Sequence, residues 1–242
     1  MTDDPDNNAS NQIRDDGEFR ATAALARPAV DVAGVDGGAV ALIIDGAAAR
    51  DLLYATDSDA VRIDELQFTI GEGPCLDAFT TGTTIAVPDL TDPAGTARWS
   101  TFASDVVDEL RVHAVLACPI TAHGAAVGVL ELHRRTPGPY TLAEVESARA
   151  IATALGPVIL TELVPRPTRD APPAPARPAR NYRLARADIN IAIGMLSTRL
   201  SVPVTDAAAA LRAHAYAKSM SISSIAHGIV NRTTDVDLDL DA

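Results

Sequence analysis

The stretch from Thr69 to Phe79, TIGEGPCLDAF, holds the residue types and spacing closest to those of a chemical site. Cys75 is its one thiol. A cysteine becomes a nucleophile when a base within hydrogen-bond reach takes its proton. The histidines nearest in sequence, His113 and His123, are 38 or more residues away. The sequence therefore favours a small buried side chain at the start of a helix, and leaves ligand or redox sensing as the second interpretation.

The charges beside Cys75 point the same way. Glu72 and Asp77 flank it in the sequence, and nearby negative charge disfavours a thiolate and raises the pKa of the thiol. We therefore expect no catalytic residue here and no enzyme. If the stretch contacts a signal molecule, its candidate residues are Gly71, Gly73, Cys75 and Asp77.

A phosphate-binding loop is the other chemistry that two close glycines suggest. The stretch lacks the third glycine of a GxGxxG loop, and no Lys–Ser/Thr pair follows it. It also carries two carboxylates where a phosphate would sit. Gly71 and Gly73 are better explained by a sharp turn, after which Pro74 opens a helix at its first position.

The spacing of potential ligand residues along the chain does not indicate a metal site. His113 and His133 lie on or beside predicted strands, but no second ligand stands at metal spacing from either. We predict no metal site and identify no cofactor. Cys118, within AVLACPI, is expected in the core.

The composition describes a chain with an aliphatic core and an uneven charge. Of 242 residues, 47% are apolar but only 4% aromatic, and the net charge is −12. Residues 1–165 carry −15, whereas residues 166–235 carry +6. Such asymmetry between halves is a hint of a nucleic-acid-binding segment on an acidic carrier. No apolar run approaches the ~20 residues that span a bilayer, and the polar N-terminus is unlike a secretory signal, so we expect a cytoplasmic protein without membrane contact.

The first part of the chain reads as an α+β domain. A disordered acidic tail is expected at 1–17, and strand patterns at 37–45 and 49–56 predict a hairpin. A helix with Ser58 as N-cap follows, then a short strand at 84–90 and a helix at 97–112. Two strands joined by AHG form a second hairpin, and Thr141 with Glu144 has the capping-box spacing of a long helix. This order predicts a mostly antiparallel sheet flanked by helices, spanning 18–163.

The remainder divides into a linker, a helical unit and a tail. Residues 164–181 are rich in proline and predict a semi-rigid linker. Residues 182–234 predict three helices, the second with Thr205 as N-cap. About 50 residues make a small core, so we expect dimerisation or packing on the first domain. An acidic tail is expected at 235–242.

The first domain resembles the GAF sensor domains of actinobacterial GAF–ANTAR regulators. The resemblance rests on ELQFTIGEGPCLDAF, followed in order by VPDLTDPAGTARW and AVGVLELHRRTPGPYT. The resemblance implies that the domain senses a signal, and a small-molecule ligand is one candidate for that signal. The Asn-Lys-Phe-Asp-Glu signature of cyclic-nucleotide-binding GAF domains is absent, since residues 1–165 contain no lysine.

The C-terminal unit resembles the ANTAR domain, an RNA-binding three-helix module of transcription antiterminators. The matching strings are AIGML (192–196), DAAAALRAHAYA (206–217) and ISSIAHGIV (222–230). Many relatives have a basic residue at Ile193 and an aromatic one at Ala208. The resemblance implies that the unit grips paired stem-loops in a nascent transcript and prevents terminator formation, and that residues of about 183–200 pair in a homodimer.

Six side chains are candidates for RNA contact. Cations suit phosphates, and aromatic rings stack on unpaired bases. The candidates are Arg199, Arg212, His214, Tyr216, Lys218 and Arg232.

Two other functions stay open. Three short helices with basic residues also suit a DNA-binding helix-turn-helix, although HAYAKSMSISSIAHGIV lacks the Arg, Asn and Gln of a helix that reads base edges. A protein-interaction module that has lost RNA binding is the second alternative, because Ile193 replaces a basic residue.

Overall fold

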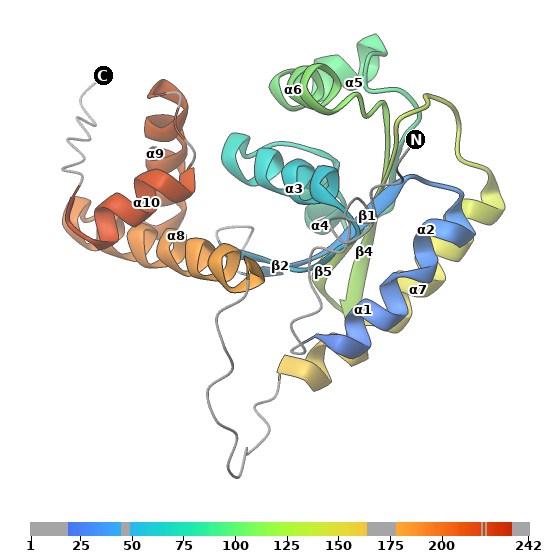
Figure 1. Cartoon of the computed structure of the whole chain (residues 1–242), viewed down its shortest axis with the longest axis horizontal. Coiled ribbons are helices and arrows are strands. Elements are labelled where there is room, and N and C mark those ends of the chain that lie inside the picture. The colour runs from blue at the N-terminus through green and yellow to red at the C-terminus, as the bar shows by residue number, and fades with distance from the viewer. Residues whose placement is uncertain (1–18, 45–48, 164–177, 219, 221, 234–242) are drawn as a thin grey trace, which may run out of the picture.

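The computed structural model describes residues 19–44, 49–163, 178–218, 220 and 222–233, with the backbone alone for 44, 49, 94–96 and 178–186. Figure 1 shows a sheet with helices on both faces and, beside it, a group of three C-terminal helices. The predicted tails at 1–17 and 235–242 and most of the predicted linker lie outside the described residues.

The sheet has five strands in the order β2-β1-β5-β4-β3, and every neighbouring pair is antiparallel. The hairpin of β4 and β5 turns at His123 and Gly124, which both have positive φ, as a tight hairpin requires. The antiparallel sheet and the two hairpins are confirmed. The strands are β1 (Gly37–Ile44), β2 (Ala49–Ala55), β3 (Ile85–Val87), β4 (Ala114–Ala122) and β5 (Ala125–Arg134).

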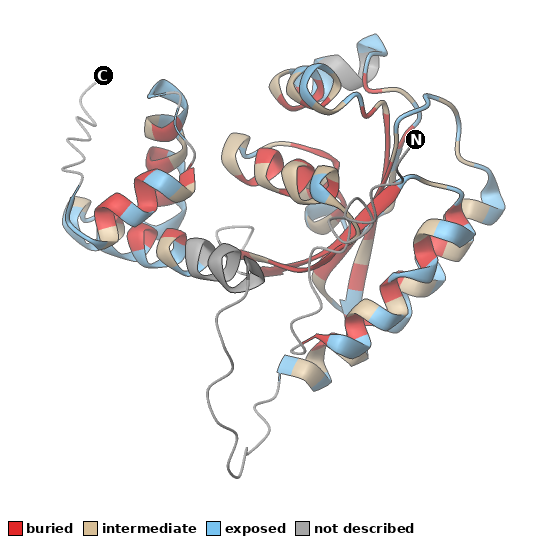
Figure 2. Cartoon of the chain, in the orientation of Figure 1, coloured by how far each residue is buried: buried red, intermediate tan, exposed pale blue. Residues whose placement is uncertain are grey.

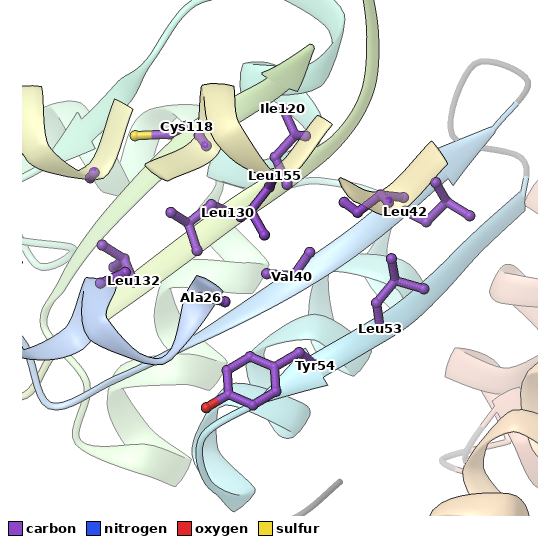
Figure 3. Close-up of a cluster of buried hydrophobic side chains, with 14 of the residues drawn as sticks. Ala26, Val40, Leu42, Leu53, Tyr54, Cys118, Ile120, Leu130, Leu132 and Leu155 are labelled. Atoms are coloured by element: carbon purple, nitrogen blue, oxygen red, sulfur yellow. The ribbon is translucent and has the colours of Figure 1, made fainter. Parts of the chain in front are cut away.

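One face of the sheet is covered by α1 (Arg20–Ala26), α2 (Pro28–Ala33) and α7 (Leu142–Leu163). Figure 3 shows the core between them, where Leu130 and Leu155 meet. Pro28 starts α2 and so divides the first helical segment into two, as its missing N–H dictates.

The predicted capping box at the start of α7 is present. Glu144 N–H donates to the Thr141 hydroxyl at 3.3 Å, and Thr141 N–H donates to the Glu144 carboxylate at 2.6 Å.

The other face carries α3 (Ser58–Ile70), α4 (Pro74–Thr81), α5 (Pro93–Arg98) and α6 (Ser100–Leu110). Because side chains alternate along a strand, Leu130 and Leu132 of β5 point to α7, whereas Glu131 lies between them on the α3 side. The N-cap of α3 is Asp57, which accepts from Ala60 N–H at 2.8 Å, so the prediction of Ser58 is wrong by one residue.

Gly156 shows how closely α7 approaches the sheet. A Cβ on Gly156 would overlap the backbone oxygen of Thr121 in β4. We expect Gly156→Ala to lower the free energy of unfolding by about 1–3 kcal/mol, because backbone must move. The matched control is Gly194→Ala, also within a helix but with open space around the added methyl; it should be neutral or stabilising by up to about 1 kcal/mol. Urea unfolding of both variants gives the comparison, and equal costs would contradict the close approach.

The C-terminal helices are α8 (Pro178–Leu200), α9 (Val204–Ala217) and α10 (Ile222–Val230). Three helices are confirmed, but α8 begins inside the predicted linker, and Pro203 rather than Thr205 is the N-cap of α9. Figure 2 shows their buried residues facing one another. Ile193 and Ala208 are both buried there, so the side chains that differ from the ANTAR pattern fill the core of the unit.

The small helical unit packs on the first domain, as its size led us to expect. Phe68 of α3 is 3% exposed and belongs to the same apolar cluster as Ile189, Leu211 and Ile225. Contacts between α3 and α9 and between α8 and β2 complete the interface, which Figure 1 shows beside β2. No helix within the described residues is long and apolar enough to cross a membrane.

Candidate sensory site

The GEGPC turn joins α3 to α4 and has the predicted geometry. Gly71 ends α3 with φ +83°, and its N–H donates to Gln67 O at 2.9 Å. Gly73 has φ +140°, and Pro74 is the first residue of α4. Both φ values lie where L side chains are strained, so the two glycines are confirmed as turn residues.

Gln67 links this turn to the sheet. Its side-chain oxygen accepts from Cys75 N–H at 2.8 Å, and its amide nitrogen donates to both carboxylate oxygens of Glu131 at 2.8 and 2.9 Å. A Cβ on Gly73 would overlap the Gln67 amide. The glycine therefore provides space for the amide as well as the unusual backbone angle.

An ion pair lies next to Gln67 in the same interior. Arg50 of β2 and Asp64 of α3 approach to 2.6 Å, with side chains 1% and 0% exposed. Arg50 also donates to the Cys75 sulfur at 3.1 Å. Five buried polar residues from four elements thus form one cluster, here called the polar cluster: Arg50, Asp64, Gln67, Cys75 and Glu131.

Burial sets the protonation of the polar cluster. It raises the pKa of Glu131 to about 7, against the opposing effects of Arg50 and the Gln67 hydrogen bond. Burial also raises the pKa of the Cys75 thiol well above its usual value, although Arg50 lowers it. Cys75 is therefore a protonated, fully buried thiol, which is poorly suited to nucleophilic chemistry.

The sequence assigns the high pKa of Cys75 to the wrong carboxylates, Glu72 and Asp77. The carboxylates that act on the thiol are Glu131 and Asp64, which are distant in sequence. Glu72 instead accepts from Thr101 and Phe102 N–H at 3.0 Å and caps α6.

Asp77, a candidate ligand residue, also has structural partners. It accepts from Arg98 Nε at 2.7 Å and from Trp99 Nε1 at 3.0 Å. The structure therefore brings Cys75 into the polar cluster and directs Asp77 toward α5 and the start of α6.

Sequence reasoning missed Arg50, Asp64, Gln67 and Glu131. The strands contained a signal, because Glu131 and the pair of Arg50 and Asp51 are charges within otherwise apolar runs. Charged residues are almost never fully buried unless they are paired. The partners, however, come from α3 and are visible only in the fold.

A pocket lies elsewhere in the same domain. It has a volume of about 440 Å³ and shares no residue with the polar cluster. Threonine hydroxyls and one guanidinium suit a small polar ligand. The lining residues are Gly82, Thr83, Thr84, Pro119, Thr121, Arg149 and Thr153.

The six RNA candidates lie on α8, on α9, at the C-cap of α9 and in the segment after α10. Arg199, Lys218 and Arg232 are exposed, as is Tyr216 at 69%, whereas Arg212 and His214 are half-buried. On α9 the 100° step per residue places Arg212 and His214 on opposite sides. The candidates therefore do not gather on one face of α9.

Arg212 lies against the first domain. Its Nε would be 3.5 Å from a Cβ on Gly71, and burial lowers the pKa of its guanidinium. Arg212 thus lies against the turn between α3 and α4, which separates Gln67 from Cys75 in the polar cluster.

The family model for the GAF domain matches residues 19–159, more than half of the chain. The chain belongs to the GAF domain family. The match covers the sheet with α1 to α6 and most of α7 and does not reach α8 to α10. A GAF domain is a signal-sensing or regulatory module, so the expected sensor domain is confirmed at this level.

Several solved structures are similar to part of this chain at low identity. A domain of a putative two-component sensor histidine kinase from Sinorhizobium meliloti is 17% identical with a TM-score of 0.45, covering 60% of this chain and 90% of that one. The GAF domain of an Acinetobacter phosphoenolpyruvate-protein phosphotransferase is 13% identical with a TM-score of 0.45, covering 62% and 87%. A free methionine-R-sulfoxide reductase from Thermoplasma acidophilum is 11% identical with a TM-score of 0.42, covering 60% and 93%. A search of curated proteins found no match.

Proposed function

We propose that this protein is a non-enzymatic, signal-responsive regulator whose GAF domain controls RNA binding by α8 to α10. Its RNA target would be paired stem-loops of a nascent transcript, and its effect would be antitermination. The observation that carries the regulatory part is that one short segment of α3 serves both units. Gln67 holds the polar cluster, Phe68 enters the C-terminal core, and Gly71 lies under Arg212.

This arrangement couples the two units physically. A signal that moves Gln67 also moves the neighbouring Phe68 and the turn beneath Arg212, because all three belong to one helix and its end. Arg212 is half-buried in the docked arrangement, so release of α9 from α3 would expose a cation to phosphate. The regulator therefore binds RNA more tightly when the two units separate.

RNA binding is tested with the full chain by fluorescence anisotropy. The probes are a tandem RNA stem-loop, a single-stranded RNA and duplex DNA, each over a salt series. We expect preference for the stem-loop and a log–log salt slope near −2, as about three phosphate contacts on unpaired RNA imply. Arg212→Ala should weaken binding, whereas Arg20→Ala, which removes an exposed arginine of α1, should not.

The same titration tests the coupling. Phe68→Ala removes the apolar contact between α3 and the C-terminal core and should tighten stem-loop binding several-fold, with circular dichroism as the check on folding. Preference for duplex DNA would favour the helix-turn-helix alternative, and equal or absent binding to all probes would favour a protein-interaction module.

Dimerisation through α8 is part of the proposal. Ile191 and Met195 are 50% and 36% exposed and stand four residues apart, on one side of the helix. If the α8 helices of two chains pack through this side, they cover Ile191 and Met195 and align the two C-terminal units. Sedimentation should show a dimer that Met195→Glu dissociates but Val32→Glu, at an exposed apolar residue of α2, leaves intact. A monomer at micromolar concentration with and without RNA would refute this arrangement.

A further inference from the structure

Three potential metal ligands meet at one end of the sheet. His133 is near the end of β5, and Asp57 and Asp59 flank the start of α3. One ligand atom from each lies within 4.8 Å of the other two, and this is the only such group of three within the residues that the structure describes. His133 is more than 70 residues from the two aspartates in sequence, which explains why metal spacing along the chain did not indicate the group.

The imidazole of His133 is directed into this group and makes no hydrogen bond among the described residues. Its side chain is 2% exposed, and Nε2 is 3.9 Å from Asp57 Oδ1, beyond hydrogen-bond distance. The geometry therefore leaves a ring nitrogen of His133 facing the two carboxylates.

The surrounding backbone holds the ligands in place. Gly37 pairs with His133 across β1 and β5, and a Cβ on Gly37 would overlap Asp57 and the His133 ring. Asp57 is fixed by Ala60 N–H at 2.8 Å and by the Thr56 hydroxyl at 2.5 Å. These contacts position the imidazole and the carboxylate before any ion arrives.

The charge around His133 favours a cation. Asp36 joins the two aspartates nearby, since its carboxylate accepts from Arg135 N–H at 2.7 Å. Three carboxylates and one guanidinium thus lie around His133. The guanidinium is that of Arg135, which pairs with Asp59 and is 57% exposed. Arg135 is long and largely in solvent, so it competes with a metal ion for Asp59 but does not enclose it.

We propose that His133, Asp57 and Asp59 bind a divalent first-row transition-metal ion of the Zn²⁺ type. One imidazole nitrogen and two carboxylate oxygens are ligands that zinc accepts, and three protein ligands leave a position for water. The imidazole selects against Mg²⁺ and Ca²⁺, which take oxygen ligands. The site is separate from the polar cluster and does not depend on the proposed RNA binding.

The test is a titration of the metal-free full chain with Co²⁺, followed by visible absorption, and with Zn²⁺ by calorimetry. We expect one ion per chain, displacement of Co²⁺ by Zn²⁺, and no binding of Mg²⁺ or Ca²⁺. Asp57→Asn should weaken binding tenfold or more, because loss of even an outer-shell partner costs roughly 10–100-fold. Asparagine caps helices as well as aspartate, so this variant keeps the fold.

Two further variants make the assignment specific. Arg135→Gln should tighten binding, because it removes the competing cation, and His133→Gln should weaken it like Asp57→Asn. The matched control is His113→Gln. Its imidazole also lies 3.9 Å from a carboxylate, that of Asp89, but without a second aspartate, and its loss should change nothing. Absence of Co²⁺ binding at millimolar concentration, or unchanged affinity in Asp57→Asn, overturns the proposal.

Discussion

Replacing Arg50 by methionine should lower the free energy of unfolding by about 3–5 kcal/mol, because loss of one partner leaves the other charge buried. Asp64 is 0% exposed and pairs with Arg50 at 2.6 Å, and Glu131 lies in the same interior. Methionine fills much of the volume but carries no charge. Urea unfolding at pH 7 measures the difference.

A surface arginine provides the matched control. Arg62 donates to Glu109 at 2.7 Å, and the two side chains are 38% and 45% exposed. Arg62→Met should change stability by no more than about 1 kcal/mol, since exposed ion pairs contribute little. The double variant Arg50→Met with Asp64→Leu should be more stable than Arg50→Met alone, because neither charge is then left unpaired. Equal costs for Arg50→Met and Arg62→Met would contradict the burial of the pair.

Stability should fall as the pH rises toward 7, and Glu131 should be the cause. Its pKa in the folded protein is about 7, against an ordinary value of 4.5. The stability that protonated Glu131 contributes is fully present below its unfolded pKa of about 4.5 and is lost as the pH rises through the folded pKa of about 7. Above that pH, Glu131 causes no further change in stability. A shift of this size corresponds to a loss on the order of 3 kcal/mol across the window.

The pH dependence is measured by urea unfolding between pH 5 and 8, in EDTA so that no metal ion contributes. Glu131→Gln keeps the size of the side chain and should abolish most of the decline. Glu109→Gln is the control, because hydrogen bonding to Arg62 lowers the pKa of Glu109 and keeps it ionised throughout this range. A decline that survives in Glu131→Gln would assign the effect to another group.

Local patterns in the sequence determined the elements of this protein. Apolar, strand-like runs predicted the two hairpins, glycine predicted the turn at Gly71 and Gly73, and the capping box of Thr141 and Glu144 marked the start of α7. The signals concern residues a few positions apart, whose backbone and caps are set by near neighbours. Boundaries were less exact: the N-caps of α3 and α9 are Asp57 and Pro203, and α8 begins inside the predicted linker.

The tertiary structure alone decided which side chains share an interior. Arg50, Asp64 and Glu131 meet because β2 and β5 lie in one sheet with β1 between them and α3 packs on the face that Arg50 and Glu131 share. Their separation along the chain gives no sign of that contact. Arg212 fits an RNA contact in the sequence, yet the fold places it over Gly71. His133 and Asp57 are neighbours for the same reason. Residue type and spacing specify elements locally, whereas the pKa and exposure of a group depend on neighbours that only packing supplies.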